Sequence, residues 1–496
     1  MYKEILKEDI AHVLDKLKAE FKSRIAAELG EESADKIASE IIILPDVYEF
    51  LPLAEYLITL EWNEYAIFAY EGKTYIASHS YRGVKEALEY IEFLAKQGGG
   101  KDFTPNFGTP CRCKVESFPS DIPNYGFGKY VGAFDHDDGN YGFIVSGTAD
   151  REFEAYIDKA VNYGYKRIKK NEIDGNIYIL LKNDANRMIY AYYSPAARRA
   201  AVIGGNDTYK DITVEGENIC PPVIWQGHPS ASNGGMGMSY FIRLGDGSFF
   251  VIDGGFNDNG EEDDLYESLK RLNVRKDGII IRAWLITHGH DDHYNTLRGF
   301  AKNKADKVTV EKIVFSPTQE DYLKNSDTVW HWDIKGMANS FNGCEFIKPF
   351  AGQKWILPGC EVEVLFSAQD AFNNQFYIKS LNNASTVIRI NVCGQNILFP
   401  ADIEADSADI ICDCFGNHLR CDILQIAHHG YHGATDEFYT LCQPKLVLYP
   451  VMDGYDKRFD DMNHGNFVWR RLPSLKNVVP SYEGSKEFVL PYDFDS

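Results

Sequence analysis

Residues 284–293 read Trp284-Leu285-Ile286-Thr287-His288-Gly289-His290-Asp291-Asp292-His293, an apolar segment that runs directly into three histidines and two aspartates. The apolar start is typical of a buried strand, and glycine permits a tight turn after it. Imidazole and carboxylate groups are the ligands that zinc and similar divalent metals prefer. The spacing H-x-H-x-D-H therefore predicts a metal-binding loop at the end of a strand rather than a solvated polar loop.

One loop cannot complete such a site, and three other segments carry ligand-type side chains. Each of these follows an apolar run: Asp253 ends a hairpin over 238–255, Asp402 ends a hairpin over 386–403, and His428 and His429 end a strand over 422–427. Strand ends on a rigid scaffold can hold side chains in a fixed geometry. We therefore expect these residues to converge on the H-x-H-x-D-H loop.

This order of motifs resembles the metallo-β-lactamase fold hydrolase superfamily over about residues 220–460. Within that range, NNASTVIRINVCGQNILFPAD (382–402) and LQIAHHGYHGA (424–434) are most similar to the soluble hydrolase domain of the competence DNA-uptake proteins and their stand-alone relatives. The phosphorylcholine esterases are similar at the HHG motif. The resemblance implies an α/β fold, an αββα sandwich of two mixed sheets flanked by helices, with a dimetal site at one edge.

The resemblance also implies six metal ligands: His288 and His290 for a first metal, Asp292 and His293 for a second, Asp402 bridging both, and His429 completing the second site. Asp253 would orient a ligand without touching metal. His429 is preferred to His428 because the ligand in this superfamily commonly stands immediately before glycine. His428 would then contact a substrate oxyanion, and the choice between the two histidines stays open.

The sequence departs from the family at the first metal. Many members place another histidine before the bridging aspartate, whereas here only His331 lies between His293 and Asp402, and its two tryptophan neighbours favour a packed aromatic cluster. The N-N-x-S segment at 382–385 is shared with the competence-like relatives. Either the first metal is under-ligated, or the amide of Asn383 helps to bind it.

The predicted chemistry is hydrolysis. Two divalent ions roughly 3.5–4 Å apart hold a bridging hydroxide and stabilise the attacking and leaving oxygens. The di-iron redox branch of the superfamily has a motif that resembles H-x-E-x-D, with glutamate at its second position. This chain has His290 at that position, which favours a zinc or manganese hydrolase. Asp292, His428 and His432 are the candidate catalytic residues. His432 would act as a general acid or contact a phosphate; alternatively, it is only a histidine of a surface loop. Asp291 is expected to be a solvated carboxylate.

The substrate is predicted less sharply than the reaction. The relatives named above favour a small phosphodiester or phosphoester, and a lactone, amide or thioester is the alternative. The formal net charge of −22 argues against long nucleic acid and against anionic membranes, which bind clustered basic residues. A small, anionic partner is therefore expected. A third possibility is a non-catalytic protein that binds a glycan or a protein on a degenerate hydrolase scaffold.

The 496 residues suggest several domains, and we expect two small α/β or α+β domains, 1–100 and 101–218, before a hydrolase domain over 219–496. The first opens with an amphipathic helix over 4–29 and contains a hairpin turning at 71–73 and a helix ending before the glycines at 98–100. The second contains a helix over 151–163 and a hairpin around 183–186. The charged start lacks the apolar core of a signal peptide, and the ten cysteines read as reduced thiols, so a cytoplasmic location is expected.

Overall fold

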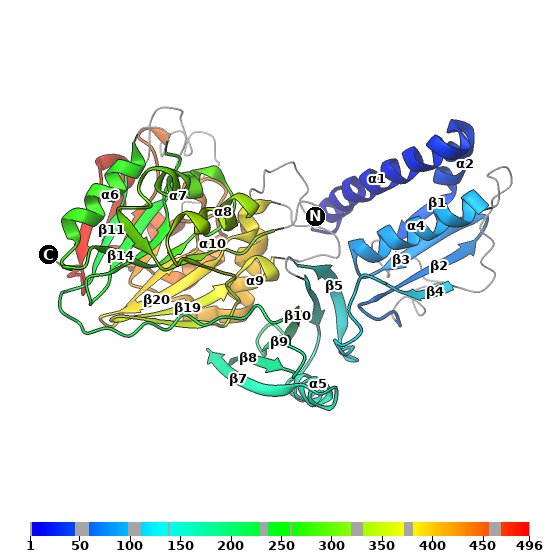
Figure 1. Ribbon diagram of the computed structural model, residues 1–496, viewed down its shortest axis with the longest axis horizontal. Helices are drawn as coiled ribbons and strands as arrows, with labels where there is room; N and C mark the ends of the chain where they lie inside the picture. Colours follow the sequence, from blue (N-terminus) through cyan, green and yellow to red (C-terminus); the bar gives the residue numbers. More distant parts are fainter. Residues whose placement is uncertain are drawn as a thin grey trace. The chain divides into compact units, whose positions relative to one another are not determined.

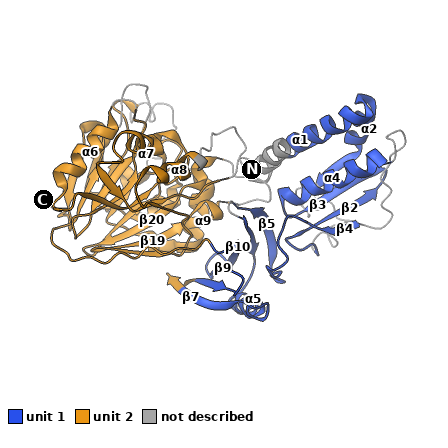
Figure 2. Ribbon diagram, in the orientation of Figure 1, with its two compact units in different colours: residues 1–170, 178–207, 372–379 blue, residues 171–177, 208–371, 380–496 orange. Residues whose placement is uncertain are grey.

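The computed structural model describes residues 2–44, 59–97, 111–136, 139–228, 237–257, 260–318, 331–371, 380–455 and 468–495. Its chain divides into two compact units (Figure 2). Unit 1 comprises residues 1–170, 178–207 and 372–379, and unit 2 comprises residues 171–177, 208–371 and 380–496. All of the predicted metal ligands therefore belong to unit 2.

Unit 1 begins with the predicted amphipathic helix, α1 (Tyr2–Leu29). Leu17, Phe21 and Ile25 are buried along one stripe of it, at 3%, 0% and 0% exposure. Gly30 separates α1 from α2 (Glu31–Glu40) with a φ of 86°, a conformation that glycine adopts without steric cost. No helix among the described residues is both long and apolar enough to cross a membrane.

A four-stranded sheet follows in the order β1-β3-β2-β4, built from β1 (Ile41–Leu44), β2 (Glu64–Tyr70), β3 (Lys73–Ser78) and β4 (Cys111–Lys114). The hairpin predicted at 71–73 is confirmed, because β2 and β3 are antiparallel with Tyr70 opposite Lys73. Helix α4 (Tyr81–Gln97) ends where the sequence predicted. From the sequence we also expect a helix that starts at Leu51 and a linker at residues 98–100, and both fall outside the described residues.

The next sheet has six strands in the order β5-β6-β10-β9-β8-β7. They are β5 (Lys129–Asp135), β6 (Asn140–Ser146), β7 (Lys166–Ile173), β8 (Asn176–Lys182), β9 (Arg187–Ser194) and β10 (Arg199–Asn206). Helix α5 (Asp150–Asn162) buries Phe153, Tyr156 and Ile157, which confirms the helix predicted there. The domain boundaries expected at residues 100 and 218 remain a prediction.

Unit 2 contains the first sheet of the predicted sandwich, in the order β17-β16-β14-β13-β12-β11-β25 with β15 beside β14. Its strands are β11 (Val223–Gln226), β12 (Ser239–Arg243), β13 (Phe249–Asp253), β14 (Ile279–Leu285), β15 (Val308–Val310), β16 (Lys312–Val314), β17 (Glu345–Ile347) and β25 (Lys486–Val489). β12 and β13 form the predicted hairpin. β13 and β14 are parallel, with Ile252 opposite Leu285, so Asp253 and the H-x-H-x-D-H motif leave the sheet at the same edge.

The second sheet of unit 2 has the order β18-β19-β20-β21-β22-β23-β24. Its strands are β18 (Lys354–Leu357), β19 (Cys360–Phe366), β20 (Val387–Val392), β21 (Gln395–Phe399), β22 (Ile423–Gln425), β23 (Leu446–Tyr449) and β24 (Asn477–Pro480). β20 and β21 form the second predicted hairpin. Because β21 and β22 are parallel, Asp402 and the two histidines 428 and 429 follow strands that end at one edge.

The two sheets pack face to face, with helices outside them (Figure 1). Alternation along β13 shows this: Phe250 and Ile252 face the core shared with the second sheet, whereas Phe249 and Val251 face a core shared with helices. The helices are α6 (Glu261–Leu272), α7 (Asp291–Asn303) and α8 (His331–Met337) on the first sheet, and α9 (Ala405–Phe415) and α10 (Asp436–Cys442) follow strands of the second. The predicted αββα sandwich is confirmed.

Candidate metal centre

The H-x-H-x-D-H motif straddles a loop and a helix. β14 ends at Leu285, and α7 begins at Asp291, with His290 as the residue that precedes the helix. The prediction that the whole motif lies in a loop is wrong, because Asp292 and His293 lie in the first turn of α7. Aspartates are favourable there because the helix dipole is positive at its N-terminus.

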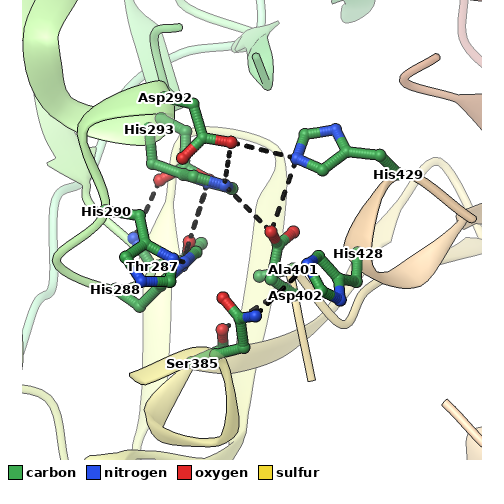
Figure 3. Close-up of polar contacts among 12 residues, drawn as sticks. Thr287, His288, His290, Asp292, His293, Ser385, Ala401, Asp402, His428 and His429 are labelled. Carbon is green, nitrogen blue, oxygen red and sulfur yellow. Dashed lines mark hydrogen bonds and ion pairs between the residues drawn. The ribbon is translucent and has the colours of Figure 1, made fainter. Parts of the chain in front are cut away.

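Four side chains in segments that follow strands of the two sheets offer ligand atoms within 4.8 Å of one another: Asp292, His293, Asp402 and His429. Nε2 of His293 lies 3.3 Å from Oδ2 of Asp402. Nε2 of His429 lies 3.1 Å from Oδ2 of Asp292 and 3.4 Å from Oδ2 of Asp402 (Figure 3). Zinc bonds of about 2.0–2.2 Å place tetrahedral ligands roughly 3.3–3.6 Å apart. The cluster therefore has the spacing that a single divalent ion requires.

In His293 and His429, the Nδ1 atom is the ring nitrogen that does not face the cluster, and each Nδ1 lies at hydrogen-bond distance from an acceptor. Nδ1 of His429 donates to the backbone oxygen of Pro450 at 2.9 Å, and Nδ1 of His293 lies 2.8 Å from Oδ2 of Asp253. A carbonyl oxygen can only accept, so Nδ1 of His429 carries a proton, and Nε2, which faces the carboxylates of Asp292 and Asp402, is the nitrogen that gives up its proton when a cation binds. Metal-binding histidines are held in this way by a carboxylate or a carbonyl.

Asp253 has the position predicted for it, behind the ligands. Its side chain is 1% exposed and also accepts the N–H of Thr287 at 2.8 Å and the hydroxyl of Thr287 at 2.9 Å. Burial raises the pKa of Asp253, while the neighbouring His293 opposes that shift. The carboxylate thus joins the strand end of β13 to the start of the motif and orients one imidazole.

His288 and His290 form a second group of nitrogens beside the four-residue cluster. Thr287 uses its hydroxyl proton on Asp253, so its oxygen accepts from Nδ1 of His288 at 3.2 Å. Nε2 of His288 is then unprotonated, and it lies 3.0 Å from Nδ1 of His290. Burial, then the nearby His293 and His290, hold the pKa of His288 well below its usual value, which keeps the ring neutral. This pair could hold another cation.

The two carboxylate oxygens of Asp402 have different surroundings. Oδ2 faces the imidazoles of His293 and His429, whereas Oδ1 is buried without a hydrogen-bond partner in the described parts of the chain. Burial favours the neutral acid, but the two imidazoles outweigh it and hold the pKa of Asp402 well below its usual range. A buried carboxylate oxygen without a donor is costly unless a cation takes it up. The four-residue cluster therefore fits a divalent cation.

Asn383 is not brought to the ligand cluster. Its Oδ1 accepts the backbone N–H groups of Glu404 at 3.2 Å and Ser407 at 3.3 Å, and its Nδ2 donates to the Glu404 carboxylate. The amide therefore holds the start of α9. Its neighbour Asn382, which the sequence analysis did not single out, donates to Nε2 of His428 at 3.2 Å.

The remaining predicted residues are not among the four members of the cluster. His428 is adjacent to the ligand candidate His429, and its buried Nδ1 has no hydrogen-bond partner among the residues that the structure describes. His432 lies edge-on to Tyr431, with ring centroids 4.5 Å apart. Asp291 is exposed, as predicted. His331 begins α8, and its side chain is outside the described part of the structure.

A family model matches part of unit 2. Residues 232–435 match the family model described as Metallo-beta-lactamase superfamily. No curated protein matches the chain. Among solved structures, the metallo-beta-lactamase fold protein YhfI from Bacillus subtilis is 11% identical over 54% of this chain and 100% of its own, with a TM-score of 0.36.

Two further solved structures are also similar. CmlA, a diiron beta-hydroxylase from Streptomyces venezuelae, is 14% identical over 54% of each chain, with a TM-score of 0.34. Igni18, a metallo hydrolase from the hyperthermophilic archaeon Ignicoccus hospitalis, is 14% identical over 54% of this chain and 98% of its own, with a TM-score of 0.31. Such scores do not bear on activity. The family match and the observed sandwich show that the chain carries a C-terminal metallo-beta-lactamase domain, residues 232–435, preceded by other α/β domains.

Proposed function

We propose that the C-terminal domain is a metal-dependent hydrolase that uses two divalent ions on a small phosphodiester or phosphoester. One observation carries this proposal. The imidazoles of His293 and His429 converge with carboxylates of Asp292 and Asp402, and each imidazole is held from behind by an acceptor. A degenerate scaffold has no physical reason to keep such a buried, pre-oriented set of ligands.

The ligands divide between two proposed sites. His288, His290 and Asp402 would hold the first ion, and Asp292, His293, His429 and Asp402 would hold the second. Zinc suits these nitrogen and oxygen donors, and manganese is the alternative. When bound, such ions act as Lewis acids and make water a nucleophile near neutral pH.

Three side chains of this protein would act on the substrate. Asn382 donates to Nε2 of His428, so Nδ1 of His428 carries the proton and is the donor we assign to a substrate oxygen. His432 is proposed as a phosphate contact or general acid. Asp292, held against His429, would in addition orient the attacking water.

The substrate class rests on the sequence. The HHG and N-N-x-S segments resemble the competence-like hydrolase domains and the phosphorylcholine esterases, which supports a phosphorus ester. His290, in place of the glutamate of the di-iron redox branch, supports hydrolysis over oxidation. The formal net charge of −22 supports a small anionic substrate over long nucleic acid. The ten cysteines are all free thiols, which supports a reducing compartment such as the cytoplasm.

The test compares substrate classes on one preparation. The purified chain is loaded with zinc or manganese and assayed on bis(p-nitrophenyl) phosphate, p-nitrophenyl phosphate, a lactone panel and a β-lactam, beside the Asp402→Asn variant. We expect metal-dependent turnover of a phosphorus ester, lost in the variant. If only the lactones or the β-lactam were turned over, the proposed phosphorus-ester substrate would be wrong and a carbonyl substrate would be favoured. Retention of less than about half an equivalent of metal after loading would favour a binding protein instead.

A further inference from the structure

The residue before the bridging aspartate has an unusual backbone conformation. Ala401 has a φ of 53°, in the left-handed region that residues with a Cβ rarely occupy. It stands between Pro400, whose nitrogen cannot donate, and Asp402. Something outside this short segment must therefore stabilise the turn that aims Asp402 at the site.

The side chain of Gln425 binds both backbone polar groups of Ala401. Oε1 of Gln425 accepts the N–H of Ala401 at 2.8 Å, and Nε2 of Gln425 donates to the carbonyl of Ala401 at 3.2 Å. The glutamine is 1% exposed. The backbone N–H of His428 also donates to this carbonyl, at 3.0 Å. Two bonds to one residue define its conformation far more closely than either bond alone.

The position of Gln425 explains why a side chain is needed. The parallel ladder between β21 and β22 pairs Ile397 with Ile423 and Leu398 with Leu424, and it ends there. Gln425 is the next residue of β22, and its amide supplies to Ala401 the bonds that the ladder no longer supplies. It thereby ties the strand end that carries Asp402 to the strand end that carries His429.

We propose that Gln425 is a positioning residue of the metal centre: its amide holds Ala401 in the left-handed conformation and so aims Asp402 between His293 and His429. Figure 3 shows Asp402 between these two histidines. This inference rests on the proposed metal centre. The hydrogen bonds of the Gln425 side chain go to backbone groups of Ala401 and Ile426, so its effect on Asp402 must pass through the backbone.

The experiment measures zinc affinity, by competition with a chromophoric chelator, and the absorption spectrum of the cobalt-loaded protein. Gln425→Leu removes both bonds to Ala401, and we expect affinity to fall about tenfold or more, with an altered cobalt spectrum. The double variant Gln425→Leu/Ala401→Gly should recover much of the affinity, because glycine adopts the left-handed conformation without the bonds.

A matched control separates positioning from lost stability. Gln353 is also a fully buried glutamine, whose amide accepts from Phe350 and Trp355 and donates to the carbonyl of Lys210. Gln353→Leu should lower the unfolding temperature comparably while zinc affinity stays within about twofold. If Gln425→Leu does not fold, Gln425→Glu is measured in its place, since it keeps one bond to Ala401 and should lose less affinity.

The outcomes are distinguishable. Wild-type protein that binds no zinc would overturn the metal centre and this inference with it. Wild-type protein that binds zinc, beside a Gln425→Leu variant that binds it equally well, would overturn the positioning role alone. The positioning role would also be overturned if adding Ala401→Gly to Gln425→Leu did not restore zinc affinity. It would be overturned as well if Gln353→Leu lowered zinc affinity as much as Gln425→Leu.

Discussion

Nε2 of His429 lies 3.1 Å from Oδ2 of Asp292, although 137 residues separate the two in the chain. Asp292 lies in the first turn of α7, after β14 of the first sheet, and His429 follows β22 of the second sheet. The contact therefore exists only when both sheets have formed and packed. Metal binding should accordingly report on the integrity of the whole sandwich.

Replacing Asp292 with asparagine should abolish tight metal binding. Asp292→Asn keeps the shape of the side chain but removes the charge that faces His293 and His429. We expect zinc affinity to fall by about 100-fold or more, beyond the usual effect of residues behind the ligands, and turnover to fall with it. Asp291→Asn is the control, because Asp291 is adjacent and exposed. Equal metal content in the two variants would contradict the ligand assignment.

Asp253→Asn should weaken the metal centre without removing a ligand. The carboxylate accepts from Nδ1 of His293 and twice from Thr287, and an amide can satisfy only part of this set. We expect zinc affinity to fall about 10–100-fold, measured by chelator competition. Asp263→Asn, at a carboxylate 67% exposed and paired with Lys304, should leave affinity unchanged. An unaltered affinity in Asp253→Asn would show that His293 needs no such support.

A buried ion pair away from the metal centre should make stability depend on pH. Asp246 is 6% exposed at its side chain and lies 3.0 Å from Arg275 and 2.9 Å from Arg282. Burial alone favours the neutral acid, but the hydrogen bonds from Ser248 and the charge of Arg282 outweigh it and lower the pKa of Asp246. The carboxylate therefore stabilises the fold above its unfolded pKa of about 3.9, and this stabilisation is lost as the pH falls through the lower folded value.

Asp246→Asn tests that dependence. It should cost about 3 kcal/mol of unfolding free energy near pH 7, because it leaves two arginines without their buried partner. The difference from wild type should shrink at pH 3, because the carboxylate of the unfolded chain takes up a proton below its pKa of about 3.9. Urea unfolding at pH 7 and pH 3 measures this difference in unfolding free energy. Asp277→Asn is the control, and its effect should be smaller because the side chain of Asp277 is 58% exposed. A cost that is the same at both pH values would exclude the charge as its source.

Gly254→Ala should disturb the packing of α7 on β13. A Cβ at Gly254 would lie 2.7 Å from the Cβ of Thr296, a buried residue of α7. We expect a loss of about 1–3 kcal/mol in unfolding free energy, and weaker zinc binding because α7 carries Asp292 and His293. In Gly336→Ala the new Cβ meets no atom within 4 Å, so this helical control should be neutral or stabilising. Equal stabilities would show that α7 can shift without cost.

Much of the centre could be predicted from the sequence because its ligands are rare side chains in short, local motifs. Asp253, Asp402 and His429 each follow an apolar strand, and the structure brings all three to one edge of the sandwich. Thr287 could have been found, since it directly precedes the first histidine of the motif. Gln425 could not, because one glutamine at the end of a strand leaves no periodic or spacing signal.

The sequence by itself determined the two hairpins and the side chains from which a metal centre can be built, since alternation of apolar residues and metal-ligand chemistry are properties of the local chain. The αββα sandwich was implied by the resemblance of its motifs to the metallo-β-lactamase superfamily. Tertiary structure alone decided that Asn383 faces α9, that Asn382 binds His428, and that Gln425 holds Ala401. Each of these contacts joins strand ends or helix starts far apart in sequence. Their geometry follows from how the strands and sheets pack, which no single segment encodes.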